Sequence, residues 1–485
     1  MQARELAWIG LLLTPTLCIA LRDRAAWDWD PARVGRNGAE LLAVLWEDPL
    51  SWPAQMLRQP GRWAPLPSWL AQVGVGLGLL VGEVDRCVRL GGVLAQGLAL
   101  GFVGGAARAL RPDSPNPARL AQLGLAASPL FVGLAGLPYA EPLLMALVAG
   151  IAWAAARAPL DSGAQTRSRL MLLGSLALLT KATAPLYAAA PLLWGVWKAS
   201  PKPGRPGPWA WVALGLMALW YALHAADALD HLLSGAGRLA GWSRSGVWPG
   251  LAELVWVLGP LTLVFGLEAV AKRGMPLRAP SAWALISGVA VILPLAWMGN
   301  QEPRFLLPWL PLLLLAFAER TRSPVAVAVV GALQLLGLTV FALGLSPGLG
   351  GLHRLRPPET DIGAWGPAMA VADLACPPGS AGRVVVAVER PDLNANTVAF
   401  ALVRWGDPSR RCPVEPAPAS WGALLDDPPA VLVLSRPGSD PPQSDPGVEE
   451  ARAAVAGWAA AAEASGRMVR LGEVEGGLHL WRIAL

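Results

Sequence analysis

The sequence predicts an α-helical, multi-pass membrane protein that ends in a small α/β soluble domain. Of its 485 residues, 54% are hydrophobic and 15% are charged. Soluble globular domains carry closer to a quarter charged residues. Apolar runs of membrane-spanning character recur as far as residue 345 and then stop. The net charge of +5 is small and spread over short turns, so it does not suggest a nucleic-acid-binding surface.

The apolar runs predict about 11 to 13 transmembrane helices, because each run approaches the length that crosses a bilayer. The first run follows Arg4 and has no convincing small-residue cleavage site, so it is predicted to be a retained first helix and not a signal peptide. In chain order the runs are 6–21, 69–81, 90–110, 120–134, 139–153, 170–179, 185–197, 209–223, 251–270, 283–298, 305–317 and 325–345.

The loops between the runs suggest an orientation. Segment 22–67 is too long for a simple connection and is predicted to be an outer loop that contributes to the active site. By the positive-inside rule, the turns rich in basic residues are cytoplasmic. This orientation places outside the first loop, the corner at 300–304 and the C-terminal region. The basic residues of the cytoplasmic turns are Arg167, Arg169, Lys198, Lys202, Arg205, Lys272, Arg273, Arg278, Arg320 and Arg322.

The chain therefore divides into a membrane domain at 1–345, a Pro/Gly-rich linker at 346–358 and a periplasmic α/β domain at 359–485. In the last part, 383–389, 430–435 and 478–483 are predicted strands, and 448–465 is a predicted amphipathic helix. Cys376 and Cys412 are free to pair as a disulfide if this domain is periplasmic; the alternative is two unrelated buried thiols. No Cys/His cluster has the spacing of a structural zinc site.

Charged side chains near membrane spans are costly to keep and are functional candidates. Two groups stand out, one of carboxylates and one of cations. They are Asp28, Asp30, Glu141 and Glu302, and Arg89, Lys181 and Arg304.

The corner Asn300–Pro308 lies between two apolar runs, and Pro303 suits the first turn of the second. Helix-start N–H groups and Arg304 together favour an anion such as a lipid-linked phosphate. The alternative is that Arg304 and Glu302 are interface anchors. Glu141, between Pro138 and Pro142, has a rival role as a helix-break residue that faces protein.

This combination of groups suits a transfer reaction that uses a lipid-phosphate donor. A carboxylate near the outer surface would deprotonate an acceptor hydroxyl. The cations would stabilise the departing lipid phosphate.

The order of these parts resembles that of the polytopic GT-C glycosyltransferases, which take sugars from polyprenyl-phosphate donors. Residues 300–305 are similar to the His-Lys-Glu-x-Arg-Phe signature of dolichyl-phosphate-mannose mannosyltransferases. Residues 304–308 match the Arg-Tyr-Leu-Leu-Pro of protein O-mannosyltransferases and lipid A aminoarabinose transferases. Residues 63–70 resemble the Pro-Pro-Leu segment that ends the first outer loop of these enzymes, and Arg89-Leu90 and Leu179–Lys181 resemble later landmarks.

The resemblance implies a transferase of the bacterial cytoplasmic membrane that uses a polyprenyl-phosphate sugar, of mannosyltransferase-like hexosyl or pentosyl type. Its acceptor would be a glycan, lipid or protein, its other contacts would be membrane lipids, and nucleic acid is not expected. It implies no particular cofactor, and a role for a divalent metal ion is left open. The C-terminal domain would be a periplasmic cap that helps to bind the acceptor.

The resemblance also assigns roles to residues. These families carry an acidic pair early in the first outer loop, and Asp30-Pro31 stands in its place here, with Asp28 two residues earlier. Asp30 or Asp28 is then the predicted base, and Arg304, Lys181 and Arg89 approach the donor phosphate. Two alternatives are a transporter or flippase of lipid-linked glycans and an inactive GT-C relative that serves as an assembly subunit. Transporters are expected to show internal repeats, and this sequence shows none.

Overall fold

The computed structural model describes residues 3–27, 29–59, 63–238, 257–261, 264, 278–297, 303–321, 324–345, 365–377, 382–386, 393–404, 412–416, 431–435, 464, 468–474 and 478–483. The chain packs as two compact units. The first unit comprises 1–22, 44–70 and 89–358, and the second comprises 23–43, 71–88 and 359–485. The domain boundaries at 345 and 359 stay a prediction, but two segments that lie early in the chain pack with the C-terminal residues.

The first unit is built from helices, several of them long and apolar. Its elements are α1 (Ala3–Leu12), α2 (Thr14–Arg22), α4 (Trp52–Arg58), most of α6 (Val84–Leu110), α7 (Asn116–Ala126), α8 (Pro129–Gly133), η1 (Leu134–Gly136), α9 (Ala140–Arg157), α10 (Gly163–Thr180), α11 (Ala184–Ala199), α12 (Pro208–Arg238), α15 (Ala279–Trp297), η3 (Pro303–Trp309), α16 (Leu310–Arg320) and α17 (Pro324–Ala342).

The prediction of a multi-pass helical membrane protein is confirmed. In the part of the chain that the structure describes, α6, α9, α12 and α17 are each long and apolar enough to cross a membrane, and α1 with α2 make up a further span bent by 55°. Two shorter apolar helices, Leu66–Val81 and Ala279–Pro294, also match predicted runs. Most of the predicted run 251–270 lies outside the described residues.

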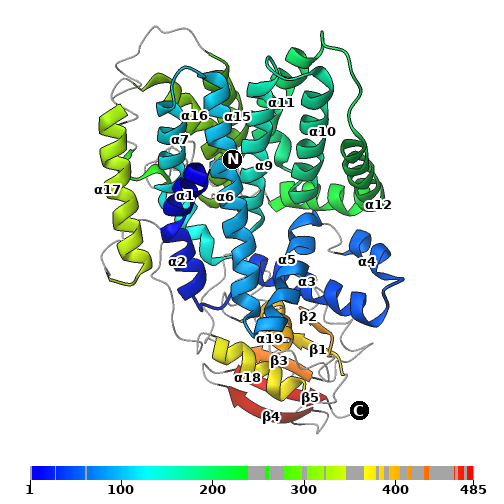
Figure 1. Cartoon of the computed structure of the whole chain (residues 1–485). Coiled ribbons are helices and arrows are strands. Elements are labelled where there is room, and N and C mark those ends of the chain that lie inside the picture. The colour runs from blue at the N-terminus through cyan, green and yellow to red at the C-terminus, as the bar shows by residue number, and fades with distance from the viewer. Residues whose placement is uncertain are drawn as a thin grey trace. The chain divides into compact units, whose positions relative to one another are not determined.

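Helix α9 is the central helix of this unit, and α10 and α11 lie beside it (Figure 1). Within its apolar stretch, 78% of α9 is buried, against 22% for α12 and 28% for α17. Ala and Gly dominate α9, and small residues let neighbouring helices approach closely. A Cβ on Gly195 of α11 would lie 3.2 Å from the Cα of Ala155 in α9. The exposed apolar side chains of α12, such as Trp209 and Leu223, are those of a lipid-facing helix.

The predicted first helix is bent and not continuous. Helix α1 ends at Leu12, α2 begins at Thr14, and the two make an angle of 55°. Pro15 has no N–H to donate to the preceding turn, so the helical ladder is interrupted there. The predicted first run is therefore helical on both sides of a bend.

The predicted long loop at 22–67 is largely helical, which corrects the sequence-based expectation. Helix α3 (Trp29–Glu47) has 19 residues and α4 (Trp52–Arg58) has seven. Gly and charged residues lower the mean hydropathy of α3, so no apolar run marks it in the sequence.

In the second unit, the first half of α3 packs closely because of two glycines. A Cβ on Gly35 would lie 2.5 Å from the Trp27 ring and 2.8 Å from the Phe400 ring. A Cβ on Gly38 would lie 2.6 Å from the backbone nitrogen of Gln72 in α5 (Leu66–Val81). The Trp27 and Phe400 rings stack with their centroids 4.3 Å apart. This core joins residues that are hundreds of positions apart in the sequence.

The segment before α3 is attached to the turn between α5 and α6. Arg24 donates to both carboxylate oxygens of Glu83, at 2.8 and 3.1 Å, and its Nη1 lies 3.5 Å from Asp85 Oδ1. The hydrogen bond to Glu83 raises the pKa of Arg24 above its usual value, although burial opposes this. Gly82 makes the turn with a φ of 72°, which favours glycine.

The C-terminal residues of this unit form a mixed five-stranded sheet in the order β2-β1-β3-β5-β4 (Figure 1). Strands β1 (Val384–Val386), β2 (Val414–Pro416) and β3 (Val431–Ser435) run parallel, and β5 (Leu478–Ile483) pairs antiparallel with β3 and with β4 (Met468–Val474). Helix α18 (Gly366–Ala375) contacts β4 and β5, and α19 (Ala395–Arg404) contacts β2. The predicted α/β character and three of the strands are therefore present, while most of the helix expected at 448–465 lies outside the described residues.

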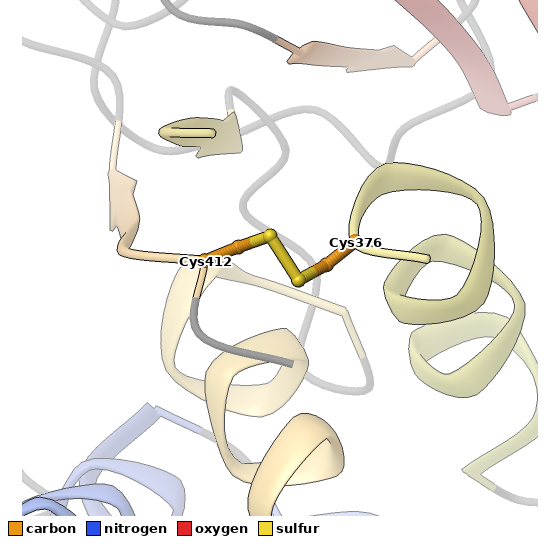
Figure 2. The surroundings of a disulfide bond; sticks show 2 residues. All are labelled: Cys376 and Cys412. Carbon is orange, nitrogen blue, oxygen red and sulfur yellow. A yellow bond between two sulfur atoms is a disulfide. The ribbon is translucent and has the colours of Figure 1, made fainter. Parts of the chain in front are cut away.

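Cys376 and Cys412 form a disulfide, as one of the two alternatives predicted (Figure 2). It joins the end of α18 to the residues that lead into β2. The two remaining cysteines, Cys18 and Cys87, are free thiols.

Candidate functional site

Glu141 lies in the first turn of α9, which is more buried than α6, α12 or α17. Only 3% of its side chain is exposed. The free N–H groups and the dipole at a helix N-terminus favour a carboxylate in this position. Tyr139, in extended conformation, is the residue just before the helix, and Pro142 lies in the first turn. Glu141 thus lies at a helix boundary and faces other charged groups, and its role stays a prediction.

Lys181 lies at the C-terminal end of α10, where the helix stops. Its backbone is extended, with a φ of −162°, and its N–H still donates to the carbonyl of Ala177. The negative end of a helix dipole favours a cation at this position. Because α9 and α10 pack against each other, the end of one meets the start of the other. The Lys181 ammonium donates to Glu141 Oε1 at 2.5 Å.

Arg304 lies in η3, a stretch of 3₁₀ helix that precedes α16. The expectation that the next α-helix begins at Pro303 is wrong, because α16 begins only at Leu310. Pro308 lies within η3 and cannot donate the amide that an α-helix starting at Pro303 would require. The tighter η3 positions the Arg304 guanidinium with its Nε 3.9 Å from Glu141 Oε1.

Glu141, Lys181 and Arg304 form what we call the Glu141 cluster. In it, one carboxylate oxygen of Glu141 faces two cations that come from separate elements. Lys181 is 26% exposed and Arg304 13%, so both cations are more accessible than the carboxylate between them. Two aromatic rings enclose the cations. The Arg304 guanidinium lies 4.4 Å from the centre of the Tyr139 ring, and the Lys181 ammonium lies 4.6 Å from that of Phe305. Ring faces attract cations, so these contacts help to hold both groups.

Hydrogen bonds from neighbouring helices position η3. The Tyr187 hydroxyl of α11 donates to the carbonyl of Phe305 at 2.8 Å, and Ser287 of α15 donates to the carbonyl of Tyr187 at 2.8 Å. The Trp309 indole donates to the carbonyl of Ala284 at 2.8 Å. Tyr139 and Tyr187 were not predicted from the sequence as site residues. Nothing in their local pattern distinguishes them, although tyrosine is rare in this chain, with three copies.

The other end of α9 and α10 carries a different set of charges. Asp161 accepts from Arg157 at 2.9 Å and also pairs with Arg169. Burial acts to raise the pKa of Asp161, but the hydrogen bonds and charges of Arg157 and Arg169 outweigh it and lower the pKa. Lys202 donates to the carbonyls of Ala158, Pro159 and Asp161. Cations therefore dominate this end, and the Glu141 cluster lies at the opposite one.

Asp30 lies in the first turn of α3, in the second unit. Its carboxylate pairs with Arg33 at 3.1 Å, and its side chain is 34% exposed. It is therefore a more solvated group than Glu141. Its role as base stays a prediction.

The remaining predicted residues are not part of the contacts described above. Asp28 and Glu302 lie outside the described residues. Arg89 is fully buried in α6, and its part in phosphate binding stays a prediction. Among the residues that the structure describes, no three His, Cys, Asp or Glu side chains lie together in a way that would hold a metal ion.

Comparison with known proteins supports the fold. A crystal structure of ArnT from Cupriavidus metallidurans bound to undecaprenyl phosphate is similar, with 16% identity and a TM-score of 0.65, over 98% of this chain and 97% of that one. ArnT from the same organism in the apo state gives 16% identity and a TM-score of 0.63, over 99% and 98%. The GT-C resemblance predicted from the motifs is thereby confirmed at the level of the fold. No protein-family model matches the sequence, and no curated protein sequence matches it either.

Proposed function

We propose that this chain, which has the GT-C fold, is a membrane glycosyltransferase that transfers a sugar from a polyprenyl-phosphate donor to a glycan, lipid or protein acceptor. The observation that carries the proposal is the Glu141 cluster, in which Lys181 and Arg304 converge from separate elements on one point. Two cations that are partly exposed and fixed at helix ends suit an anionic phosphate. ArnT, which has the same fold, was crystallised with undecaprenyl phosphate.

In the proposed reaction, an acceptor hydroxyl attacks the anomeric carbon of the donor sugar. The new carbon–oxygen bond forms as the bond from that carbon to the lipid phosphate breaks, and the hydroxyl proton passes to a carboxylate base. The polyprenyl phosphate departs with the electron pair. Lys181 and Arg304 would stabilise the negative charge that develops on it.

We assign the base to Asp30, or to Asp28 beside it, on the resemblance of the motifs. Asp30 is accessible enough to receive a proton, since about a third of its side chain is exposed. Arg33 holds the carboxylate within 3.1 Å and would keep its orientation. Arg89 is proposed as a third cation that binds the donor phosphate, on the same grounds, and Glu302 is proposed as a supporting group.

We infer that the Glu141 cluster faces the outer side of the bacterial cytoplasmic membrane. Helix α9 has 18 residues and is thus about 27 Å long, close to the thickness of a hydrocarbon core of about 30 Å. Its far end meets Arg157, Arg169 and Lys202. By the positive-inside rule, that end is cytoplasmic and the end with Glu141 is external.

Glycolipid and glycan profiles of cells that carry Arg304→Ala or Asp30→Asn, at normal protein levels, test the proposal. Each variant is expected to lose the transferred sugar, because one removes a phosphate-binding cation and the other removes the base. Asp161→Asn is a matched control: Asp161 is also a carboxylate shared by two cations, but at the opposite end of α9. An unchanged profile in both variants would overturn the assignment and favour an assembly subunit or a transporter.

A further inference from the structure

The position of Glu141 requires an explanation beyond phosphate binding. A site that only had to attract phosphate would be stronger without a buried carboxylate between its two cations, since the carboxylate competes with the ligand for both. Glu141 Oε1 nevertheless lies 2.5 Å from the Lys181 ammonium and 3.9 Å from Arg304 Nε. Its side chain is almost fully buried, so water screens its charge weakly.

The proposed reaction changes the charge of the lipid. The donor is a phosphodiester with one negative charge. The product is a phosphate monoester, whose second ionisation has a pKa of about 6, so that near neutral pH it carries close to two charges. Two unopposed cations would bind the product more tightly than the donor, and product release often limits the turnover of enzymes.

We propose that Glu141 is a specificity-determining residue that matches the site to a singly charged phosphodiester and weakens its hold on the doubly charged product. The inference rests on the proposed function. The negative charge of Glu141 offsets part of the positive potential of Lys181 and Arg304, and it repels the second charge of the product. It also keeps the two cations together when no lipid is bound, since both are paired with the same oxygen.

Glu141→Gln separates this role from a purely structural one. The substitution keeps one acceptor oxygen for the Lys181 ammonium, removes the negative charge and replaces the other oxygen by an amide NH2 of similar size. Binding to purified protein in detergent is measured at pH 8 with two probes, a polyprenyl phosphate and its methyl phosphodiester. The probes share one chain and differ by about one charge at this pH.

Wild-type protein is expected to bind the methyl diester at least as tightly as the monoester. In Glu141→Gln, the preference is expected to shift toward the monoester by about tenfold or more, the equivalent of about 1.4 kcal/mol. A charge a few ångströms away exceeds this value at the lower effective dielectric of a partly buried site. Asp161→Asn, which removes a carboxylate that is also shared by two cations, is expected to leave the preference unchanged.

The outcomes distinguish the two proposals. If wild-type protein binds both lipids and Glu141→Gln leaves their ratio unchanged, the role of Glu141 is wrong and the proposed function stands. If wild-type protein binds neither lipid, the phosphate site itself is wrong. Should Glu141→Gln fail to fold, the wild-type ratio decides alone: tenfold tighter binding of the monoester would overturn the role of Glu141.

Discussion

The two regions proposed to carry the chemistry are held in different ways. The Glu141 cluster is fixed by ion pairs between helix ends, and its carboxylate is almost fully buried. Asp30 lies on α3, where its pair with Arg33 is formed within one helical turn and is about one-third exposed on the carboxylate side. Elsewhere along α3 close packing holds the helix, with Gly35 against Trp27 and Phe400 and Gly38 against Gln72.

The difference predicts that the two regions fail in different ways when altered. Buried charges in the membrane unit are coupled to one another, so that removing one exposes the others to an unfavourable environment. The region of Asp30 depends on ordinary core packing and a disulfide, and its exposed ion pair contributes little. Substitutions in the first region should change transfer, while most in the second should change stability.

Lys181→Ala is expected to have the largest effect. Loss of one of the two cations should lower the transfer rate by about 10²- to 10³-fold, the usual cost of removing one group that stabilises a developing anion. Lys198→Ala is a matched control, since Lys198 lies over the rings of Trp194 and Trp197 elsewhere in the same unit. Initial rates of sugar transfer measure the effect, and equal rates for the two variants would contradict it.

Replacing Cys376 and Cys412 together by Ser is expected to destabilise the second unit by about 2–4 kcal/mol, since the bridge closes a loop across 36 positions of the sequence. Unfolding by denaturant, followed by tryptophan fluorescence, measures the loss. Cys18→Ser, which alters a free thiol in the first unit, is the control and should have a small effect. A double variant as stable as the control would show that packing alone holds α18 to the strands.

Gly35→Ala is expected to destabilise the protein by about 1–3 kcal/mol, because the added methyl would overlap the rings of Trp27 and Phe400. Gly76→Ala is the matched control in the same unit. There, a Cβ would lie 3.7 Å from Leu42, and alanine in a helix is favoured over glycine by up to about 1 kcal/mol. Relative to wild type, the free energy of unfolding is expected to fall in Gly35→Ala and to rise in Gly76→Ala. Changes of the same sign and size in both variants would refute the packing argument.

Tyr187→Phe removes the hydroxyl that donates to the carbonyl of Phe305 and should cost about 1 kcal/mol of stability. Because this hydrogen bond positions η3, the transfer rate should fall roughly fivefold, the equivalent of the same energy. Tyr221→Phe loses a similar hydrogen bond, which is made to the carbonyl of Leu178 in α10 and not to η3. Stability and rate should both change in the first variant, and stability alone in the second. Equal transfer rates in the two variants would show that the position of η3 does not affect sugar transfer.

Arg33→Gln is expected to have the smallest effect on stability, about 0.2–1 kcal/mol, because its pair with Asp30 is partly exposed. If Asp30 is the base, the transfer rate should change more than stability does, since the orientation of the carboxylate is altered. Rates and unfolding energies of the same preparations test this. A loss of stability above about 2 kcal/mol would show that the region depends on this ion pair after all.

The sequence by itself determined the membrane class, many of the helices and the identity of the charged candidates. Helices and strands follow from local apolar patterns, and a charge beside an apolar run is visible wherever it occurs. The local pattern was therefore sufficient to single out Glu141, Lys181 and Arg304. The same reasoning assigned α3 to a long loop, because glycines that only its packing partners explain interrupt its amphipathic pattern.

Only the tertiary structure decided which candidates meet. Glu141 and Lys181 are 40 positions apart and come together because α9 and α10 pack side by side with opposite ends matched. Likewise, the Trp27–Phe400 stack joins the start of the chain to its C-terminal part. Such contacts depend on the shapes of whole helices and on small residues at their interfaces, and these are not encoded within any one segment. The local pattern therefore specified the groups, and helix packing specified the site.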